Sequence, residues 1–353
     1  MSKVRVGIVG VGYMGKAHAL CYQQDPLAEV TMVSARRAER AQSLADQLGC
    51  RWTTDWKELI ADPDVDVVDI CAPNHLHLPI ALAAIEHRKP FLIEKPLARS
   101  AEEARVIVEA QEAAGLTAVY GENLRYAPAY VKAKEIIDQG GIGDVIMLRI
   151  NEIHNGPFHS DWFWDAGKTG GGALIDMGIH GLYMAEWLAG DQVEHVYGEM
   201  GVLKWHDKCL NGAEDTAFAV LRFRNGAMAE VVNSWAASGG IDVRIEIYGT
   251  KGTIYVDVSR NVGLRVYSEP GYGPRLEVEA AERPHASSTI GWSTPVPDEW
   301  QVHGHLPEVR HFLDCVRGQA EPLTTLRSGW RTLTLVEALY RSAKEGRRVT
   351  VEC

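Results

Sequence analysis

The sequence predicts an α/β domain with a doubly wound parallel sheet over residues 1–123, followed by an α+β domain with a mostly antiparallel sheet over residues 124–353. Three observations carry this prediction. A chain of 353 residues is longer than one hydrophobic core usually fills. Short apolar runs alternate with helical patterns up to about residue 123, whereas strand-like runs joined by hairpin turns dominate afterwards.

Apolar strands and helices alternate through the first domain. In chain order we expect a strand at 4–9, a helix at 16–24, a strand at 29–34, a helix at 38–48, a strand at 64–73, a helix at 79–87, a strand at 90–96 and a helix at 101–114. The short loops between them imply parallel pairing with right-handed crossovers. Ligands of such sheets bind at the carboxyl ends of the strands.

The pattern of the second domain is different. We expect a helix at 128–139, strands at 145–154, 195–204, 215–224, 227–234, 242–248, 253–258 and 263–267, helices at 306–317 and 328–345, and a short final strand. Turn signals at 224–226 and 249–252 join neighbouring strands as hairpins. The stretch 269–304 is rich in Pro, Gly and Ser and is expected to be a long connection.

Composition excludes several classes of protein. The formal net charge of −11 and the scattered basic residues argue against nucleic-acid binding. The six cysteines form no C-x-x-C pair, so neither a zinc site nor a disulfide framework is indicated, and a reducing cytoplasm fits best. No stretch approaches the ~20 apolar residues that a membrane span needs, so no membrane association is expected.

A glycine-rich turn follows the first strand. Gly10, Gly12 and Gly15 spell G-x-G-x-x-G between an apolar strand and a helix, which is the context that a dinucleotide-binding turn requires. The amides near Tyr13 and Met14 would supply donors to a pyrophosphate at the helix start. A helix-packing turn without a ligand is the alternative, and the further β-α units behind the turn disfavour it.

The end of the second strand bears on the choice of cofactor. An NAD site normally carries an acidic residue there for the ribose 2′-hydroxyl, but this chain has Ser34, Arg36 and Arg37. The serine hydroxyl can donate to a 2′-phosphate, and an arginine can pair with it through two hydrogen bonds. The sequence therefore favours NADP slightly over NAD, although both arginines could simply be solvated at a helix start.

Three residues suit proton transfer. Lys95 follows a buried strand at the edge where ligands are expected, and Asp176 and His180 are four residues apart in a predicted helix. A carboxylate beside an imidazole, together with a lysine, can handle protons near neutral pH. A structural ion pair for Lys95 and a buried capping interaction for the Asp–His pair are the alternatives.

The segment before this helix is aromatic and polar. Trp162 and Trp164 lie close in sequence to His154, and aromatic faces with polar neighbours suit a carbohydrate. The tryptophans could equally be core or interface residues. His154, His159 and Asp161 keep a metal site open as an alternative, but no second convincing ligand cluster accompanies them, so no metal is expected.

Together, the glycine turn, the Glu94-Lys95-Pro96 step, and a glycine triplet followed by Asp176-x-x-x-His180 resemble the glucose-fructose oxidoreductase, inositol dehydrogenase and MocA family. The segments 121–126 and 249–252 also resemble segments of that family. The resemblance covers nearly the whole chain. It implies a Rossmann domain followed by a domain with a large open, mostly antiparallel sheet. That sheet commonly packs against a partner subunit, which implies a homo-oligomer, either a dimer or a tetramer.

The resemblance also implies roles for individual residues. Lys95 and His180 would contact the reacting hydroxyl, and Asp176 would orient the sugar or His180. Arg125 and Tyr126 would lie on the substrate side with His154, Trp162 and Trp164. The residues that would line the cofactor are Ala72, Pro73, Asn74, His77, Glu94, Lys95 and Asn123. Many members carry an aspartate where this chain has Tyr183, which puts a close relation to the inositol dehydrogenases in doubt.

The function that we expect is an NADP- or NAD-dependent dehydrogenase or reductase acting on a secondary alcohol or ketone of a sugar, glycoside or cyclitol. One alternative is an enzyme that keeps its nicotinamide bound and recycles it within each turnover, as in sugar–sugar oxidoreductases or redox-assisted glycoside cleavage. A second alternative is a non-catalytic sensor that binds NAD(P).

Overall fold

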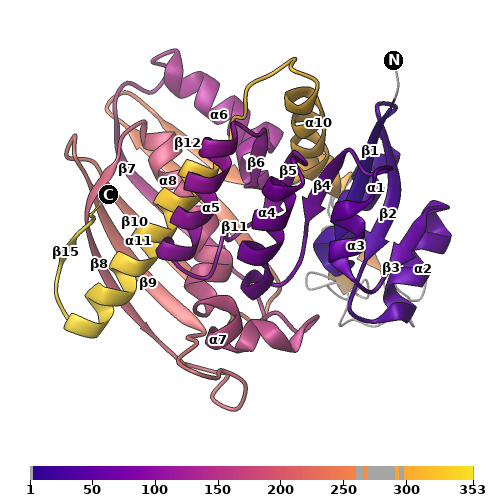
Figure 1. Cartoon of the computed structure of the whole chain (residues 1–353). Coiled ribbons are helices and arrows are strands. Elements are labelled where there is room, and N and C mark those ends of the chain that lie inside the picture. The colour runs from indigo at the N-terminus through magenta and orange to yellow at the C-terminus, as the bar shows by residue number, and fades with distance from the viewer. Residues whose placement is uncertain (1–2, 260–265, 269–290, 294–297, 353) are drawn as a thin grey trace. The chain divides into compact units, whose positions relative to one another are not determined.

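The computed structural model of the chain describes residues 3–259, 266–268, 291–293 and 298–352 (Figure 1). It divides into two compact units, one formed by residues 1–126 with 304–333 and the other by 127–303 with 334–353. The sequence analysis assigns everything after residue 123 to the second domain, whereas the segment 304–333 belongs to the first unit. The reason is that helix α10 (His305–Val316) buries apolar side chains, among them Phe312 and Leu313, and packs on helix α1 (Tyr13–Gln23).

The first unit is built on a six-stranded sheet with the order β3-β2-β1-β4-β5-β6, in which every pairing is parallel. This confirms the predicted doubly wound sheet. Its strands are β1 (Val4–Val9), β2 (Ala28–Ser34), β3 (Arg51–Thr53), β4 (Val67–Ile70), β5 (Phe91–Glu94) and β6 (Ala118–Gly121). The sequence analysis missed β3 and β6 because both are short and lack a long apolar run.

Helices connect the strands of the first unit. They are α1, α2 (Ala38–Leu48), α3 (Trp56–Ala61), α4 (His77–Glu86), α5 (Ala101–Ala114), the short η1 (Asn74–Leu76) and η2 (Asn123–Tyr126), α10, and the start of α11 (Leu326–Glu345). Local signals define several ends. Ser100 caps α5 by accepting the N–H of Glu103, and α2 ends at Gly49, which adopts a left-handed conformation with φ of 69°.

The second unit is built on a seven-stranded sheet with the order β12-β11-β7-β10-β9-β8-β15 (Figure 1). Its pairings are antiparallel except for β7 with β10, which run parallel, so the prediction of a mostly antiparallel sheet is confirmed. Its strands are β7 (Val145–Ile153), β8 (Val193–Gly201), β9 (Thr216–Phe223), β10 (Met228–Ser234), β11 (Asp242–Gly249), β12 (Thr253–Asp257) and β15 (Val349–Thr350).

Helices of the second unit cover one face of this sheet. They are α6 (Pro128–Asp138), η3 (Asp161–Trp164), α7 (Ala166–Thr169), η4 (Leu174–Gly178), α8 (Ile179–Ala189), α9 (Glu299–Val302) and the end of α11. A small separate sheet pairs β13 (Val266–Ser268) with β14 (Gly291–Ser293). Most of the predicted connection 269–304, and residues 263–265 of a predicted strand, lie outside the described residues.

The other face of the seven-stranded sheet is open within the described part of this unit. Along β9, Phe218 and Val220 are exposed while Ala219 and Leu221 are buried, which is the alternation of a sheet with one covered face. Large apolar side chains of neighbouring strands are exposed as well: Met147, Tyr197, Met228 and Tyr255. Across residues 3–259 and 298–352, no helix is long and apolar enough to span a bilayer.

Candidate functional site

The glycine turn after β1 has the geometry of a phosphate cradle. Gly10 has φ of 99°, and a Cβ there would lie 2.4 Å from the carbonyl oxygen of Cys71. A Cβ on Gly15 would lie 1.9 Å from the carbonyl oxygen of Gly10, so both positions exclude a side chain. Gly12 faces open space, and as the N-cap of α1 it provides no side-chain hydrogen bond to the helix. Open space in front of an uncapped helix start fits the pyrophosphate of a dinucleotide.

The residues predicted to read the ribose lie beside this turn. Ser34 ends β2, is buried, and its carbonyl accepts the N–H of Gly10. Arg36 and Arg37 are both exposed, and Arg37 is the N-cap of α2. The structure therefore places the Ser34 backbone next to the glycine turn and leaves the side chains of Arg36 and Arg37 exposed.

The Glu94–Lys95 turn follows β5 directly. The Glu94 carboxylate accepts the backbone N–H of Lys95 at 3.0 Å, and the Lys95 side chain is half-buried. His77 braces this turn: its Nδ1 lies 2.8 Å from the carbonyl oxygen of Pro96, and its Nε2 lies 2.8 Å from that of Ala72. His77 is completely buried and joins the loop after β4 to the turn that carries Lys95, and its place along the cofactor stays a prediction.

A buried acid–imidazole network lies against Glu94. His18 of α1 has Nδ1 2.8 Å from Asp69 and Nε2 3.3 Å from Glu94. Burial alone would raise the pKa of Glu94, but its pairing with His18 lowers the pKa to about 2. Burial opposes the charge on His18, yet the contributions of Asp69 and Cys71 together outweigh it, and the pKa of the imidazole is well above its usual range. Both effects favour an ion pair.

Three other predicted residues lie at the end of β6. Asn123, Arg125 and Tyr126 all belong to η2. Tyr126 is buried, and its hydroxyl lies 2.8 Å from Oγ1 of Thr324, which fixes its ring inside the first unit. Ala72 and Asn74 are buried after β4, with Pro73 half-buried between them.

Metal ligation has candidates other than those that the sequence suggested. Among the described residues, two groups place ligand atoms close enough for an ion: His18 with Asp69 and Cys71, and His18 with His305 and Glu308. Both groups contain His18, whose imidazole already forms ion pairs with Asp69 and Glu94. The residues that kept a metal site open in the sequence analysis, among them His154, do not belong to either group.

In the second unit, the glycine triplet lies against a buried carboxylate. Glu214 accepts the N–H of Gly172 at 3.0 Å and that of Leu174 at 2.8 Å, and the hydroxyl of Tyr340 donates to the same carboxylate. A Cβ on Gly172 would lie 1.9 Å from the Glu214 carbonyl oxygen, and one on Gly171 would lie 1.9 Å from the Tyr340 hydroxyl. Glu214 thereby holds the start of the helical segment that carries Asp176.

The ionisation of Glu214 differs from that of Glu94. Burial raises its pKa to about 7, because the backbone amides and Tyr340 that surround it are neutral donors and offset only part of the desolvation.

Asp176 and His180 lie on consecutive helical segments. Asp176 is in η4, a π-helical turn, and His180 is the second residue of α8; both are buried. Trp235 donates its Nε1–H to Asp176 at 3.0 Å, and the His154 Nε2 lies 3.6 Å from the same carboxylate oxygen. Because the N–H of Gly156 donates to His154 Nδ1, the ring proton belongs on Nε2, facing Asp176. Single π-helical turns occur frequently at functional sites.

The predicted aromatic residues have different environments. Trp164 is almost completely buried, with its ring centroid 5.1 Å from that of Trp235 and 5.9 Å from that of Trp205. Trp162 is half-buried and stacks on Phe163 with a centroid separation of 3.9 Å. Trp164 therefore supports the indole that holds Asp176. A substrate contact for either tryptophan stays a prediction.

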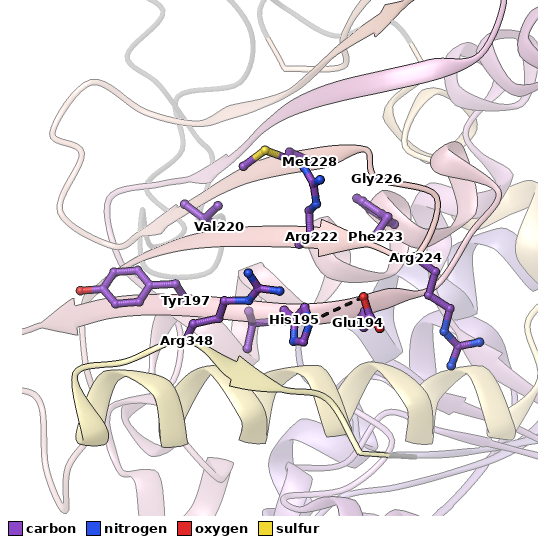
Figure 2. Close-up of a pocket in the computed structure, with 11 residues that line it drawn as sticks. Glu194, His195, Tyr197, Val220, Arg222, Phe223, Arg224, Gly226, Met228 and Arg348 are labelled. Atoms are coloured by element: carbon purple, nitrogen blue, oxygen red, sulfur yellow. Dashed lines mark ion pairs between the residues drawn. The ribbon is translucent and has the colours of Figure 1, made fainter.

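Figure 2 shows a pocket of about 480 Å³ on the open face of the seven-stranded sheet. Arg222 and Arg348 point over it together with Tyr197, and His195 pairs with Glu194 at 3.5 Å. None of its lining residues was predicted to belong to the site. It lies on the opposite face of the sheet from the helices, so it is a feature of the open face.

The sequence analysis missed the residues that hold the predicted ones. His18, Glu214, Trp235 and Tyr340 each contact a predicted site residue or the backbone beside it. His18 had a usable signal, since it lies one helical turn after Gly15 in an otherwise apolar helix. The other three come from distant parts of the chain, and nothing in the local pattern connects them to Asp176.

A dinucleotide-binding turn on a parallel sheet, with a buried carboxylate and two imidazoles on a second unit, is typical of a nucleotide-dependent oxidoreductase. Comparison with known proteins agrees: the chain belongs to the oxidoreductase family with an NAD-binding Rossmann fold. The model of that domain matches residues 4–122, and the model of the GFO/IDH/MocA C-terminal domain matches residues 130–255. The predicted family is confirmed.

Relatives and solved structures cover the whole chain. A myo-inositol 2-dehydrogenase of Thermotoga maritima is 30% identical over 99% of both chains. A levoglucosan dehydrogenase of Pseudarthrobacter phenanthrenivorans is 32% identical over 75% of this chain and 76% of its own length. The crystal structure of GenD2 from gentamicin A biosynthesis, in complex with NAD, superimposes with a TM-score of 0.92 at 29% identity, covering 100% of this chain and 97% of that one.

Proposed function

We propose that this oxidoreductase transfers a hydride between a nicotinamide cofactor and a secondary alcohol or ketone of a sugar, glycoside or cyclitol. The observation that carries the proposal is the buried Asp176, held by Trp235 and paired with His154 in the unit that carries His180. Polar groups on a buried, braced segment suit a polyhydroxylated ligand. The names of the relatives, which include inositol and levoglucosan dehydrogenases, support the same substrate class.

The chain's own residues handle the proton of the substrate hydroxyl. In the oxidative direction His180 takes that proton, and the Lys95 ammonium stabilises the developing alkoxide; the two roles can be exchanged. Asp176 orients the sugar or His180. When bound, the nicotinamide cofactor would supply the hydride acceptor, and the glycine turn and the Glu94–Lys95 turn would hold it.

An absorbance screen tests this proposal. Purified protein is mixed with NAD or NADP and a panel of inositols, anhydrosugars and glycosides, and nicotinamide absorbance is followed in both directions. We expect at least one cyclitol or sugar to react, with Lys95→Ala and His180→Ala losing roughly 100-fold or more in kcat. His206→Ala, an exposed histidine of the second unit, is the control and should leave kcat unchanged. No reaction with any member of the panel, or full activity of Lys95→Ala, would contradict the proposal.

The preference between cofactors rests on the end of β2. We propose that NADP binds more tightly than NAD, because Ser34 at the end of β2 and Arg36 shortly after it stand where an acidic residue would otherwise repel a phosphate. Arg36→Ala should weaken NADP roughly tenfold and leave NAD nearly unchanged. Isothermal titration of both cofactors measures this, and NAD binding at least as tightly as NADP would refute it. GenD2, a neighbour in complex with NAD, makes the comparison necessary.

The open sheet face supports an oligomer. We propose that a second copy of the chain covers the exposed Phe218, Val220 and Tyr197, since an apolar surface of this kind favours association. Sedimentation should show a dimer or tetramer, and Val220→Asp should shift it toward monomer. A wild-type monomer at micromolar concentration would contradict the proposal. The reducing cytoplasm is the compartment we propose, because Cys21, Cys50, Cys71, Cys209 and Cys315 are all free thiols.

A further inference from the structure

Among the described residues, the network under the Glu94–Lys95 turn is a buried group of titratable side chains to which the proposed chemistry gives no role. His18 and Asp69 have no exposed surface, and Glu94 has 7%. Each is polar enough that burial needs compensation by charge or hydrogen bonds. The arrangement therefore has a cost in stability that a merely structural core would avoid with apolar residues.

His18 is the cation of this network. The groups that face it are Asp69 in β4, Cys71 directly after that strand, Glu94 at the end of β5, and His305 and Glu308 in α10; Tyr22 of its own helix interacts with Asp69. Its Nδ1 lies 2.8 Å from Asp69 and its Nε2 lies 3.3 Å from Glu94, so one imidazole bridges two carboxylates from neighbouring strands. Nδ1 makes a hydrogen bond with Asp69, whereas Nε2 has no hydrogen-bond partner among the described residues and lies at ion-pair distance from Glu94, where a protonated ring places its second N–H.

The third carboxylate near His18 has another ionisation state. Glu308 lies 3.8 Å from His18 Nε2, and neither of its oxygens has a hydrogen-bond partner. Burial raises its pKa well above the usual range, so Glu308 is the neutral acid of the group. The positive charge of His18 then faces two anions, Asp69 and Glu94.

We propose that His18 is a positioning residue for the active site: as a buried imidazolium anchored by Asp69, it keeps the Glu94 carboxylate ionised, and that carboxylate fixes Lys95. The link to Lys95 is the 3.0 Å hydrogen bond from its backbone N–H to Glu94 Oε2, while Oε1 of the same carboxylate faces His18. The inference rests on the proposed function, in which Lys95 acts on the substrate hydroxyl. It adds that a residue of the nucleotide-binding helix sets the charge beside that lysine.

Removal of the imidazolium has a defined consequence. Without a cation at Nε2, a carboxylate as buried as Glu94 takes up a proton, and the backbone of Lys95 then faces a neutral acid. The ammonium of Lys95 also loses a nearby anion. We expect His18→Gln to lower kcat roughly 10- to 100-fold through misplacement of Lys95 and to change the pH profile of kcat, with little change in cofactor affinity.

Activity and ionisation are measured separately. Infrared spectra near neutral pH report the carbonyl stretch of protonated carboxylic acids. In the wild-type background, Glu308→Gln should remove such a band and Glu94→Gln should not. In the His18→Gln background, Glu94→Gln should now remove a band. His87→Gln, an exposed histidine of the same unit, is the activity control.

Several outcomes would overturn the inference. One is a wild-type band that Glu94→Gln removes, which needs no His18 variant and so does not depend on that variant folding. Another is an unchanged kcat and pH profile in His18→Gln. A third is a stoichiometric divalent metal in the purified protein, because a metal would then hold the carboxylates in place of the imidazolium. Turnover that does not need Lys95 contradicts the proposed function instead and leaves the infrared result unaffected.

Discussion

Two buried carboxylates, one in each unit, hold the backbone next to a predicted catalytic residue, and they differ in what surrounds them. Glu94 faces the His18 imidazole, and its pKa is lowered to about 2 even though burial alone would raise it. Glu214 accepts hydrogen bonds from backbone amides and the Tyr340 hydroxyl, and burial raises its pKa to about 7. Both accept hydrogen bonds, so hydrogen bonding does not explain the difference.

Of these two acids, the one that faces a cation has a lowered pKa, and the one that is held by neutral donors has a raised pKa. Neutral donors stabilise a carboxylate, but they recover only part of the free energy of hydration that is lost on burial. The first unit therefore presents a permanent anion beside Lys95. The second presents, at the start of the segment that carries Asp176, an acid that titrates close to neutral pH.

The largest effect is expected from Gly172→Ala, which adds a Cβ where the Glu214 backbone already lies. The new Cβ would lie 1.9 Å from the Glu214 carbonyl oxygen. Because this contact is with backbone and not with a flexible side chain, the glycine triplet has to move. We expect a loss of about 3 kcal/mol in the free energy of unfolding and nearly complete loss of kcat. Chemical denaturation and the absorbance assay measure these two effects.

Gly201→Ala is the matched control for this variant. Gly201 belongs to the same unit, and a Cβ there would meet nothing within 4 Å. It should change the free energy of unfolding by less than about 1 kcal/mol. Equal behaviour of the two variants would show that the Glu214 contact does not constrain the triplet.

The pH dependence of stability should have opposite signs at the two acids. The folded-state pKa of Glu214 lies above its ordinary value of 4.5, so its contribution is complete below pH 4.5 and is lost as pH rises through about 7. Glu94 contributes above 4.5 and loses its contribution as pH falls toward 2. Relative to Glu214→Gln, the wild type should lose on the order of 3 kcal/mol as pH rises through this window.

Unfolding by urea across this pH range measures the difference. The same comparison with Glu94→Gln should give the opposite trend at acid pH. If the stability differences from Glu214→Gln and from Glu94→Gln changed with pH in the same direction, the two acids would share one type of environment, contrary to the structure.

A smaller effect is expected at Trp235, because it holds the Asp176 side chain and not the backbone of the glycine triplet. Trp235→Phe keeps an aromatic ring against Trp164 but removes the N–H that Asp176 accepts at 3.0 Å. A hydrogen bond to a charged group contributes about 2 kcal/mol, so kcat should fall roughly tenfold or more while cofactor affinity stays the same. Steady-state kinetics with fluorescence titration of the cofactor tests this, and a change confined to cofactor affinity would argue against it.

The smallest effect is expected at Tyr340. Tyr340→Phe removes one neutral donor from Glu214 and leaves the two amide hydrogen bonds in place. The free energy of unfolding should drop by about 1 kcal/mol. The pH at which stability declines should move upward, because the carboxylate loses stabilisation relative to the neutral acid. Tyr197→Phe, at an exposed tyrosine, serves as the control. A shift to lower pH in Tyr340→Phe would contradict the assignment.

Sequence reasoning anticipated much of the fold because periodic patterns determine long elements. The helices α2 and α5 have the predicted bounds, and the glycine turn lies between a strand and a helix as expected. Sequence reasoning missed β3, which has three residues. It also assigned the segment 304–333 to the second domain, because the packing of α10 on α1 depends on contacts that no local pattern reveals.

The candidate site shows the same division. Sequence motifs indicated the predicted residues, but no motif indicated the residues that hold them in place. Glu214 supports the segment of Asp176 from 38 positions further along the chain, and Tyr340 from the final long helix. His77 was assigned to the cofactor by its place in the sequence, and only its two carbonyl partners show that it braces the loop.

Direct detection of hydride transfer tests the central claim. A substrate from the panel, deuterated at its ring carbons, is incubated with the protein and oxidised cofactor, and the reduced nicotinamide is examined by NMR. We predict deuterium at C4 of the nicotinamide with the wild-type protein, and transfer that is strongly reduced in His180→Ala. Reduced cofactor that carries no deuterium, or no reduced cofactor when both ligands are bound, would contradict the account.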